Sequence, residues 1–491
     1  MERIKLKKLL KNIPVEAIKG SKDIEISGLC SNSKLVAPGD LFIAKKGLTH
    51  DGAYFIPDAI AAGASAILTD LYNPFFSHIT QIIHPDVASI EAAIANEFYG
   101  HPSERLFLVG ITGTNGKTTT SYLVRHLFES NEIGCGLIGT IEWIVGNHVF
   151  PSGKTTPDIL QNYKLFHDMV MKGCQSSVME VSSHALDQGR VRAIEFDVAV
   201  FTNLTQDHLD YHKTMEKYAQ AKSQLFSTLN IEEKKGFAKK AVVNADSPYF
   251  LQMIASCRAE ILTYGIERPC DLRAQQVQLS ALGVEFELNY RGEKIPFSSS
   301  LIGRFNVYNI LAAIGVGLSR GLVLKEILKG LSTFKSVPGR LERVPNDQGL
   351  NIFVDYAHTD DALFNVLKTL NELKKGHLIT VFGCGGNRDP SKRPKMGAVV
   401  EALSDRFVVT SDNPRHEDPE EIIRNILDGL KKPDQALVIA DREKAINHAI
   451  HLARPDDIVL IAGKGHENYQ IFSHHTIDFD DRIIAQEACR K

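Results

Sequence analysis

The residues best suited to chemistry lie in the stretch VGITGTNGKTTTSYL, residues 109–123. Gly113 and Gly116 would let backbone N–H groups approach phosphate oxygens, Lys117 could bridge the β- and γ-phosphates, and Thr118 could offer a hydroxyl to Mg²⁺. An apolar run precedes the stretch and a helical pattern follows, as a phosphate loop requires, although Ile111 replaces the first glycine of GxxxxGK[ST]. A plain glycine turn is the alternative, but Lys117 with the threonines behind it disfavours that interpretation. We predict an NTP site formed by Gly113, Thr114, Asn115, Gly116, Lys117, Thr118 and Thr119.

Two further polar side chains follow buried runs. Glu180 ends the run in VMEVSSH, and His208 lies in TNLTQDHLDYH, after the next run. No Walker-B run of four apolar residues ending in Asp-Glu is found. Both side chains should lie near strand ends that face the loop, where an oxygen and an imidazole suit magnesium-type chemistry. By composition alone, a lone histidine after a strand is more often a surface or cap residue.

Arg415 stands directly behind a proline in SDNPRHEDPEEI, residues 411–422, between an apolar run and a predicted helix. An arginine in such a loop fills no core, and its planar fork can hold a carboxylate through two hydrogen bonds. The alternative is an arginine at the rim that pairs with Glu417 or Asp418. The sequence therefore predicts a local anion site or a surface ion pair.

The composition describes an ordinary globular protein of 491 residues, with 43% hydrophobic and 23% charged residues. A net charge of −3 indicates no nucleic-acid partner held by bulk charge. The seven cysteines are scattered without a CxxC pair, which favours a reducing cytosol over disulfides or zinc. The basic N-terminus lacks an apolar segment, and no stretch reaches 18 apolar residues. We expect a cytoplasmic protein with no membrane partner.

The elements that would position these residues form an α/β protein of three domains. Residues 1–102 mix short strands and helices, with a helix, a stop at Gly63 and a buried strand. Residues 103–337 alternate buried runs with helices, which predicts a P-loop-type parallel sheet, interrupted by a hairpin near 279–292. Residues 338–491 alternate again as a Rossmann-like unit, which binds ligands at the carboxyl ends of its strands. Its predicted strands are 351–357, 377–386, 405–412, 435–441 and 457–463.

The motifs GTNGKTT, MEVSSHAL, NLTQDHLDYH, YAQAKSQLF, VPGRLERV and VDYAHT follow one another in this order. Together they resemble the Mur ligases, ATP-dependent amide-forming enzymes that build the peptidoglycan stem peptide. The resemblance runs from about residue 30 to the end. Residues 31–60 and the string GKGHE resemble the third enzyme of that series, which extends UDP-N-acetylmuramoyl-L-alanyl-D-glutamate.

The resemblance implies a reaction through an acyl phosphate, with ATP and two Mg²⁺ ions as cofactors. The catalytic residues would be Lys117, Glu180, His208 and Lys222. Thr118 and Glu180 would serve one magnesium, and His208 the second. Lys222, in YAQAKSQLF, would be carbamylated and so become an anion that helps to bind the second magnesium. From spacing alone it would be a solvated lysine on a helix.

For the nucleotide beyond its phosphates, the resemblance implies Asn306, Arg340, Asp355 and His358. Arg340 and Asp355 come from the third domain or its hinge, so we expect the site to be complete only when that domain closes. Without the family, Asn306 would be a helix cap and Arg340 a surface ion.

For the nucleotide-sugar substrate, the family's motifs match two groups of residues. Near the uridine they are Ser31, Ser33, Leu48, Thr49 and His50. Around the muramoyl peptide they are Thr155, Thr156, Ser182, Gln188 and Arg190. The family commonly has Asp-Ser-Arg where this chain has Asn32, Ser33 and Lys34, so the chain departs from the family's pattern beside the residues matched to the uridine.

The resemblance also bears on the amino acid that is added. The DNPR string, Asp412, Asn413, Pro414 and Arg415, looks like the form that takes meso-2,6-diaminopimelate. Arg415 would read the distal carboxylate, Asp412 and Asn413 would grip the distal ammonium group, and Arg388, Gly463 and Glu467 would complete the pocket.

We expect a monomer acting on small molecules. The alternatives are a homologue that adds L-lysine, a ligase like folylpolyglutamate synthase, or a nucleotide-dependent switch.

Overall fold

The computed structural model describes residues 3–47 and 50–490. The chain divides into two compact units, Met1–Cys270 with Ala312–Ile327, and Asp271–Leu311 with Leu328–Lys491. The three domain ranges expected from the sequence stay a prediction. No helix in the described ranges is long and apolar enough to cross a membrane.

The N-terminal part of the first unit is a five-stranded sheet in the order β2-β7-β6-β5-β4. Its strands are β2 (Ala17–Lys19), β4 (Gly28–Cys30), β5 (Asp40–Ile43), β6 (Ala66–Thr69) and β7 (Thr80–Ile83), all parallel except β2. The helices here are α1 (Leu6–Leu9), α2 (Ile56–Ala61), α3 (Val87–Phe98) and α4 (Pro102–Arg105), and β1 (Ile4–Lys5) pairs with β3 (Glu25–Ile26). The predicted helix, glycine stop and strand around Gly63 are thus confirmed as α2 and β6.

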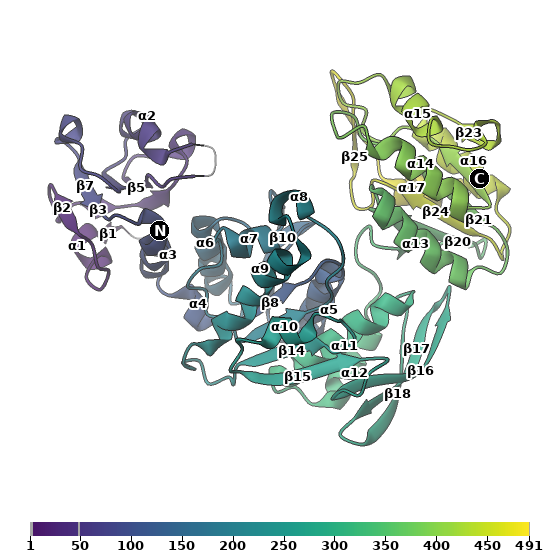
Figure 1. The fold of residues 1–491 in the computed structure, drawn as a ribbon, viewed down its shortest axis with the longest axis horizontal. Coiled ribbons are helices and arrows are strands. Elements are labelled where there is room, and N and C mark those ends of the chain that lie inside the picture. Colours follow the sequence, from purple (N-terminus) through teal and green to yellow (C-terminus); the bar gives the residue numbers. More distant parts are fainter. Residues whose placement is uncertain (1–2, 48–49, 491) are drawn as a thin grey trace. The chain divides into compact units, whose positions relative to one another are not determined.

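The larger sheet of the first unit runs in the order β11-β10-β9-β12-β8-β13-β14-β15. The parallel strands are β8 (Phe107–Thr112), β9 (Cys135–Ile138), β12 (Ser176–Glu180), β13 (Val198–Phe201), β14 (Lys240–Asn244) and β15 (Glu260–Gly265). The strands β10 (Glu142–Val145) and β11 (His148–Pro151) extend it as an antiparallel hairpin. All six residues of β8 are buried. Such a strand is apolar throughout because both faces of a parallel sheet are covered (Figure 1).

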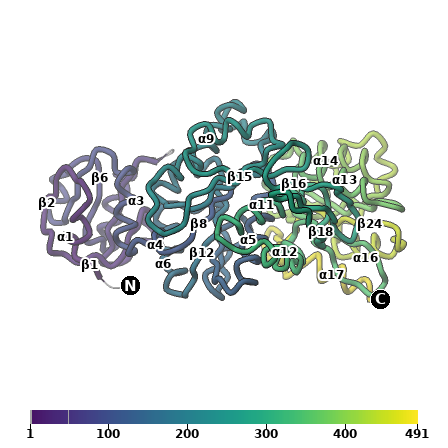
Figure 2. The backbone as a smooth tube through the Cα atoms, turned by 90° about the horizontal axis from the view of Figure 1, so that it is seen from below, coloured from purple at the N-terminus to yellow at the C-terminus, as the bar shows by residue number. Residues whose placement is uncertain are grey.

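Helices connect these strands: α5 (Lys117–Ser130), α6 (Ile159–Met171), α7 (Ser183–Asp187), α8 (Leu209–His212), α9 (Met215–Ser227) and α10 (Phe250–Ile254). Three of them start at a residue whose side chain caps the helix: Asp158 before α6, Ser182 before α7 and Thr214 before α9. In the first unit, α3 packs against α6, where Nδ1 of His167 lies 2.9 Å from the carbonyl oxygen of Tyr99. Figure 2 shows β8, β12 and α5 together in this part of the chain.

The second unit begins with an antiparallel meander of β16 (Leu272–Ser280), β17 (Gly283–Tyr290) and β18 (Glu293–Ser299). The sequence predicted only the first hairpin of this meander. The helices α11 (Arg304–Ser319) and α12 (Leu324–Ser332) follow it along the chain.

The rest of the second unit is a six-stranded sheet in the order β19-β20-β24-β21-β22-β23. Its strands are β19 (Glu342–Arg343), β20 (Asn351–Asp355), β21 (Leu378–Phe382), β22 (Arg406–Val409), β23 (Leu437–Val438) and β24 (Ile458–Ala462), with only β19 antiparallel. The helices α13 (Asp360–Leu373), α14 (Lys392–Leu403) and α15 (Pro419–Leu427) cover one face, and α16 (Arg442–Leu452) and α17 (Asp481–Ala488) the other. The pair β25 (Tyr469–Ile471) and β26 (Thr476–Asp478) lies beyond β24.

The core of this sheet follows the two-residue period of its strands. Phe353 contributes to the cluster under α13, α14 and α15, whereas its neighbours Ile352 and Val354 contribute to the cluster under α16 and α17. The Rossmann-like prediction is confirmed. The predicted strand at 435–441 is wrong in extent, because only the exposed edge strand β23 forms there.

Candidate active site and amino-acid pocket

The loop between β8 and α5 is held in the geometry that the sequence predicted. Gly113 has φ of 153°, and a Cβ there would lie 1.9 Å from Oγ1 of Thr202, so a larger residue would displace the loop. Gly116 has φ of 84° and precedes α5, whose first N–H groups therefore face the loop. The Lys117 ammonium donates to the carbonyl oxygens of Gly113 and Thr114, at 2.9 and 2.8 Å. The loop thus combines a helix N-terminus with a lysine at its centre.

The carboxylate of Glu180 lies beside the start of α5. It is fully buried at the end of β12 and accepts hydrogen bonds from the Thr118 hydroxyl (2.9 Å) and from the N–H and hydroxyl of Thr140 (2.9 Å each). In the described part of the chain no lysine or arginine forms an ion pair with this carboxylate. A buried carboxylate next to a threonine hydroxyl, with neutral partners only, fits Mg²⁺, which takes one or two carboxylates and completes its shell with water and phosphate.

Lys222 is buried in α9, with 1% of its surface exposed. Its ammonium donates to the carbonyl oxygen of Gly113 at 2.9 Å and lies 4.6 Å from the centre of the Tyr218 ring. Burial lowers the pKa of Lys222 well below its usual value, and the nearby charge of Lys117 lowers it further. The solvated lysine that spacing alone predicted is wrong, and the structure brings this amine to the phosphate loop.

His208 belongs to a group of aromatic residues beside the same loop. Its ring centre lies 4.9 Å from that of His184 and 6.0 Å from that of Tyr218. Burial lowers its pKa, an effect that Asp207 opposes and that Lys117 and Lys222 reinforce. His208 is therefore a neutral imidazole at neutral pH, the form that ligates metals. Among residues 3–47 and 50–490, no three His, Cys, Asp or Glu side chains are grouped for a metal. The donors at Glu180 are instead largely hydroxyl and backbone groups.

The residues predicted to hold the muramoyl peptide lie around the end of β12. Thr156 donates its hydroxyl to the carbonyl oxygen of Glu180 at 2.8 Å and accepts from the N–H of Ser182 at 3.0 Å. Arg190 bonds to the Gln188 side chain and to the carbonyl oxygen of Thr156. Thr155 joins the group through the hydroxyl of Thr140, 3.1 Å away. The structure thus brings all five of these residues together in one hydrogen-bonded group.

The residues predicted near the uridine lie in the N-terminal sheet. Ser31 and Ser33 are half-buried after β4, where the Asn32 side chain accepts from the N–H of Lys34 at 3.1 Å. Asn32 therefore caps a short 3-10 turn, a role that Asp would also fill. His50 is exposed beside Phe55. Leu48 and Thr49 lie outside the described residues.

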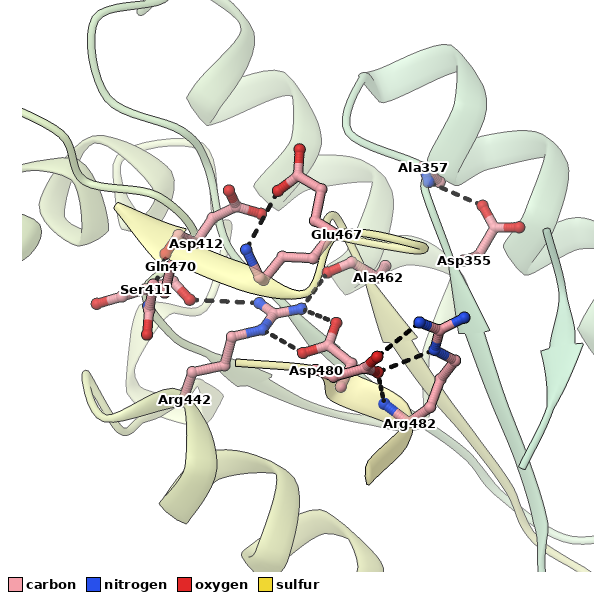
Figure 3. Close-up of polar contacts among 12 residues, drawn as sticks. Asp355, Ala357, Ser411, Asp412, Arg442, Ala462, Glu467, Gln470, Asp480 and Arg482 are labelled. Carbon is pink, nitrogen blue, oxygen red and sulfur yellow. Dashed lines mark hydrogen bonds and ion pairs between the residues drawn. The ribbon is translucent and has the colours of Figure 1, made fainter. Parts of the chain in front are cut away.

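The residues predicted around the rest of the nucleotide belong to the second unit. Asn306, in the first turn of α11, donates to the carbonyl oxygen of Ile302 at 2.8 Å and accepts from Asn309 at 2.9 Å. The buried Asp355 carboxylate accepts from the N–H groups of Leu341 (2.7 Å) and Ala357 (2.8 Å), and burial raises its pKa. Figure 3 shows the bond between Asp355 and Ala357.

Asp355 therefore stabilises the turn that carries Arg340. Leu341 has φ of 41°, a costly conformation for a bulky side chain, and its N–H is one of the two that Asp355 holds. Arg340 lies over the Tyr356 ring, 5.2 Å from its centre. Nδ1 of His358 lies 2.8 Å from the carbonyl oxygen of Tyr356.

Arg415 lies in the loop after β22, with φ of 52°. Its N–H donates to the carbonyl oxygen of Ile471 at 3.0 Å, and its guanidinium donates to the carbonyl oxygen of Gly386 at 2.7 Å. In the described part of the chain Arg415 forms no ion pair with Glu417 or Asp418, the alternative at the rim. Glu417 pairs with Arg393 at 2.7 Å, and the Asp418 side chain caps α15. The remaining guanidinium N–H groups of Arg415 have no protein acceptor in the described part of the chain, which suits a carboxylate ligand.

Asn413 and Glu467 form a closed group with a residue that the sequence did not single out, Lys464. The Asn413 amide donates to Glu467 at 2.8 Å and accepts from the Lys464 ammonium at 3.2 Å. Lys464 is fully buried and also bonds to Glu467 at 3.2 Å. Of the two carboxylates expected near the ligand's ammonium group, Asp412 and Glu467, the second is thus already balanced by Lys464. A buried lysine in GKGHE, 51 residues from Asn413, has no local signal in the sequence.

Asp412, Gly463 and Arg388 complete the neighbourhood. A Cβ at Gly463, where φ is 116°, would lie 2.6 Å from the Asp412 carboxylate, so only glycine allows these two strand ends to approach. Arg388 is exposed after β21. Asp412, Arg388 and Gly463 follow β22, β21 and β24, which confirms that these motifs lie at carboxyl ends of strands.

Comparison with known families matches almost the whole chain. A model described as the Mur ligase middle domain matches residues 111–317. One described as the Mur ligase glutamate ligase domain matches residues 339–465, and one described as the Mur ligase family catalytic domain matches residues 25–99.

Individual proteins extend this likeness. The chain is 44% identical to UDP-N-acetylmuramoyl-L-alanyl-D-glutamate–2,6-diaminopimelate ligase of Halalkalibacterium halodurans, over 95% of each chain. It is 46% identical to the protein of that name from Chlamydia caviae, over 98% of each. A solved structure, also titled UDP-N-acetylmuramoyl-L-alanyl-D-glutamate–2,6-diaminopimelate ligase, is 32% identical with a TM-score of 0.74, and the match covers 100% of this chain and 99% of that one.

Proposed function

The chain belongs to the Mur ligase family, and from this premise we propose that it joins meso-2,6-diaminopimelate to UDP-N-acetylmuramoyl-L-alanyl-D-glutamate. The observation that carries the proposal is the 44% identity over 95% of both chains to a ligase of that name. Enzymes of this family are ATP-dependent, ADP-forming amide ligases that need Mg²⁺ and act on small molecules. The reaction serves peptidoglycan precursor synthesis.

The first step activates the free carboxylate of the D-glutamate. Its oxygen attacks the γ-phosphorus of ATP, so an acyl phosphate forms and ADP leaves. The loop N–H groups, the N-terminus of α5 and the Lys117 ammonium offset the phosphate charge. Lys117 would exchange its carbonyl acceptors, Gly113 and Thr114, for phosphate oxygens. The loop therefore contributes positioning and charge rather than covalent chemistry.

The second step forms the amide. The amine of diaminopimelate attacks the acyl carbon, and the tetrahedral intermediate collapses with loss of phosphate. We propose that Thr118 and Glu180 hold one Mg²⁺, and that His208 and the carbamate of Lys222 hold a second. Magnesium at these sites would offset the charge that develops on the transferring phosphoryl group. The neutral amine that burial gives Lys222 is the form that reacts with CO₂.

Specificity for diaminopimelate is assigned to the strand ends of the second unit. The distal end of diaminopimelate carries a carboxylate and an ammonium group, whereas lysine carries the ammonium group alone. We propose that Arg415, which has N–H groups to spare, takes the carboxylate, and that Asp412 and Asn413 take the ammonium group, with Glu467 supplying negative charge for it. Removal of the ligand carboxylate leaves the guanidinium of the half-buried Arg415 without that partner, which costs roughly 10⁴ in specificity. We further propose that the protein is a cytoplasmic monomer without a membrane partner.

Phosphate release with UDP-N-acetylmuramoyl-L-alanyl-D-glutamate and ATP, in the presence of diaminopimelate, L-lysine or neither, tests the function. Phosphate release should require both the UDP-linked dipeptide and diaminopimelate. Mass spectrometry should find the tripeptide product only when diaminopimelate is present. Lysine addition within about tenfold of diaminopimelate addition would indicate the lysine-adding homologue. Slow ATP hydrolysis at a rate that neither amino acid changes would indicate a nucleotide-dependent switch.

A further inference from the structure

Arg442 is the first residue of α16, and its side chain is completely buried. It forms a two-point ion pair with Asp481, the first residue of α17, with Nε 2.8 Å from Oδ1 and NH2 2.7 Å from Oδ2. Asp481 is itself fully buried. Because the cost of burying two charges is high, such a pair is retained only where further hydrogen bonds or a function use it.

The other N–H groups of this guanidinium reach two backbone carbonyl oxygens. NH1 donates to Ser411 at 3.3 Å and NH2 donates to Ala462 at 3.0 Å (Figure 3). Ser411 precedes Asp412, and Ala462 precedes Gly463. Both carbonyls lie at carboxyl ends of strands, β22 and β24, which are separated in the sheet by β21. Arg442 thus connects two strand ends that are not neighbours.

Two other contacts stabilise the loop after β22. Gln470 donates to the carbonyl oxygen of Asp412 at 2.6 Å, and Ile471 donates its N–H to Asn413 at 3.0 Å. These contacts come from β25 and reach only the β22 end. Arg442 joins the β22 end to the β24 end through backbone carbonyl oxygens, beneath the side-chain hydrogen bonds by which Asn413 contacts Glu467 and Lys464. Its planar fork serves four acceptor atoms at once, which a lysine ammonium with three N–H groups cannot do.

The pair also leaves the charge of the pocket unchanged. Asp481 neutralises Arg442, so the pair adds no net charge beneath the loops of Asp412 and Gly463.

We propose that Arg442 and Asp481 are positioning residues for the amino-acid pocket, because they set the separation between the loop of Asp412 and the loop of Gly463. The inference rests on the proposed function. An error in that separation should weaken the binding of diaminopimelate and leave the nucleotide and the UDP substrate unaffected. A misplacement of about 1 Å in such a site costs up to about 10²-fold.

Two variants test the inference in the full chain. Arg442→Lys keeps a cation beside Asp481 and removes the fork. The double variant Arg442→Met/Asp481→Leu removes both charges together, so no buried charge is left unpaired and the fold is retained. Both should raise KM for diaminopimelate about tenfold or more, with kcat and the KM values for ATP and the UDP substrate within about twofold.

Arg482→Gln is the matched control. Arg482 is the next residue of α17 and forms a similar two-point pair with Asp480, at 2.9 and 2.6 Å (Figure 3). In the described part of the chain its guanidinium donates to Asp480 and Glu342 and not to the carbonyl groups of Ser411 or Ala462. Its KM for diaminopimelate should stay within about twofold of the parent value.

Three outcomes overturn the inference: an unchanged KM for diaminopimelate in both Arg442 variants, a parallel loss for all three substrates that follows the melting temperature, or an equal rise in the control. Failure of the unaltered protein to use diaminopimelate would instead contradict the proposed function, so the two failures are distinguishable.

Discussion

Lys222 shows how far one residue can depart from the usual behaviour of its type. Lysine is rarely buried without a carboxylate partner. In α9, however, Lys222 lies on the apolar stripe, four residues after Tyr218 and three before Leu225, both of which are buried. A lysine on the buried stripe of an amphipathic helix was the signal available in the sequence. Only the structure shows that the Lys222 ammonium on this stripe contacts the phosphate loop at Gly113.

Lys222→Ala tests the carbamate. We expect the variant to fold and to lose activity, because no anion then stands beside His208. Acetate or another small carboxylic acid should restore part of the activity by occupying the space that the side chain leaves. Rates are measured by ADP release with and without the acid, and Lys213→Ala, at an exposed lysine of the loop before α9, serves as the control. No rescue in a variant of normal melting temperature would contradict the carbamate.

His466 leads to a prediction about acid stability. Burial lowers its pKa to about 4, and the charges of Arg340 and Arg482 contribute to the shift. The unfolded chain has an ordinary histidine pKa of about 6.5, so between these values the unfolded state binds more protons than the folded state. The folded protein should therefore lose stability as the pH falls from about 6.5 towards 4.

The variant His466→Phe keeps a ring beside Tyr356, whose centre lies 5.0 Å from that of His466, and removes the titration. Its melting temperature should fall less between pH 7 and pH 5, values chosen to bracket about 6.5, than that of the parent. His448→Gln, at an exposed position of α16, is the control and should keep the parent's pH dependence. The same fall in His466→Phe as in the parent would show that another group is responsible.

At the scale of elements, the loops at the strand ends approach their neighbours so closely at certain glycines that a Cβ atom would not fit there. Gly113→Ala would bring its Cβ within 1.9 Å of the Thr202 hydroxyl and within 3.1 Å of the Asn203 backbone. We expect this variant to fold with a displaced loop and to lose ATP binding, measured by calorimetry with a non-hydrolysable ATP analogue. Gly134→Ala is the control, since its Cβ would lie 3.4 Å from the nearest atom. Parent-like affinity in Gly113→Ala would show that the loop adjusts freely.

The same scale shows what the sequence could predict. Strands β8, β12, β13 and β14 were predictable because a run buried on both faces is apolar throughout. The length of the strand predicted at 435–441 was overestimated. Its observed strand, β23, lies at the edge of the sheet with one neighbour, so most of that apolar run pairs with no other strand. The third strand of the meander, Glu293–Ser299, was missed because it contains Pro296 and two charged residues, which weaken the alternating pattern.

At the scale of the whole molecule, motifs predicted which residues matter, and tertiary structure supplied their neighbours. Thr140 beside Glu180 and Lys464 beside Asn413 are 40 and 51 residues apart along the chain, and no periodicity connects such pairs. Arg442, the first residue of α16, belongs to none of the motifs found in the sequence. In each compact unit, predicted site residues follow the carboxyl ends of parallel strands, which agrees with the general rule for such sheets.

The contacts of Arg442 with main-chain oxygens have a consequence for evolution. The Arg442 guanidinium binds Ser411 and Ala462 through their carbonyl groups. These contacts therefore do not depend on which side chains stand at these positions or at the positions that follow. Substitutions of the pocket side chains, at Arg415 and its neighbours, can therefore accumulate without loss of the Arg442 contacts to the backbone. We expect a change of amino-acid preference to need few substitutions, all in loops, while the arginine at 442 and its aspartate persist through the transition.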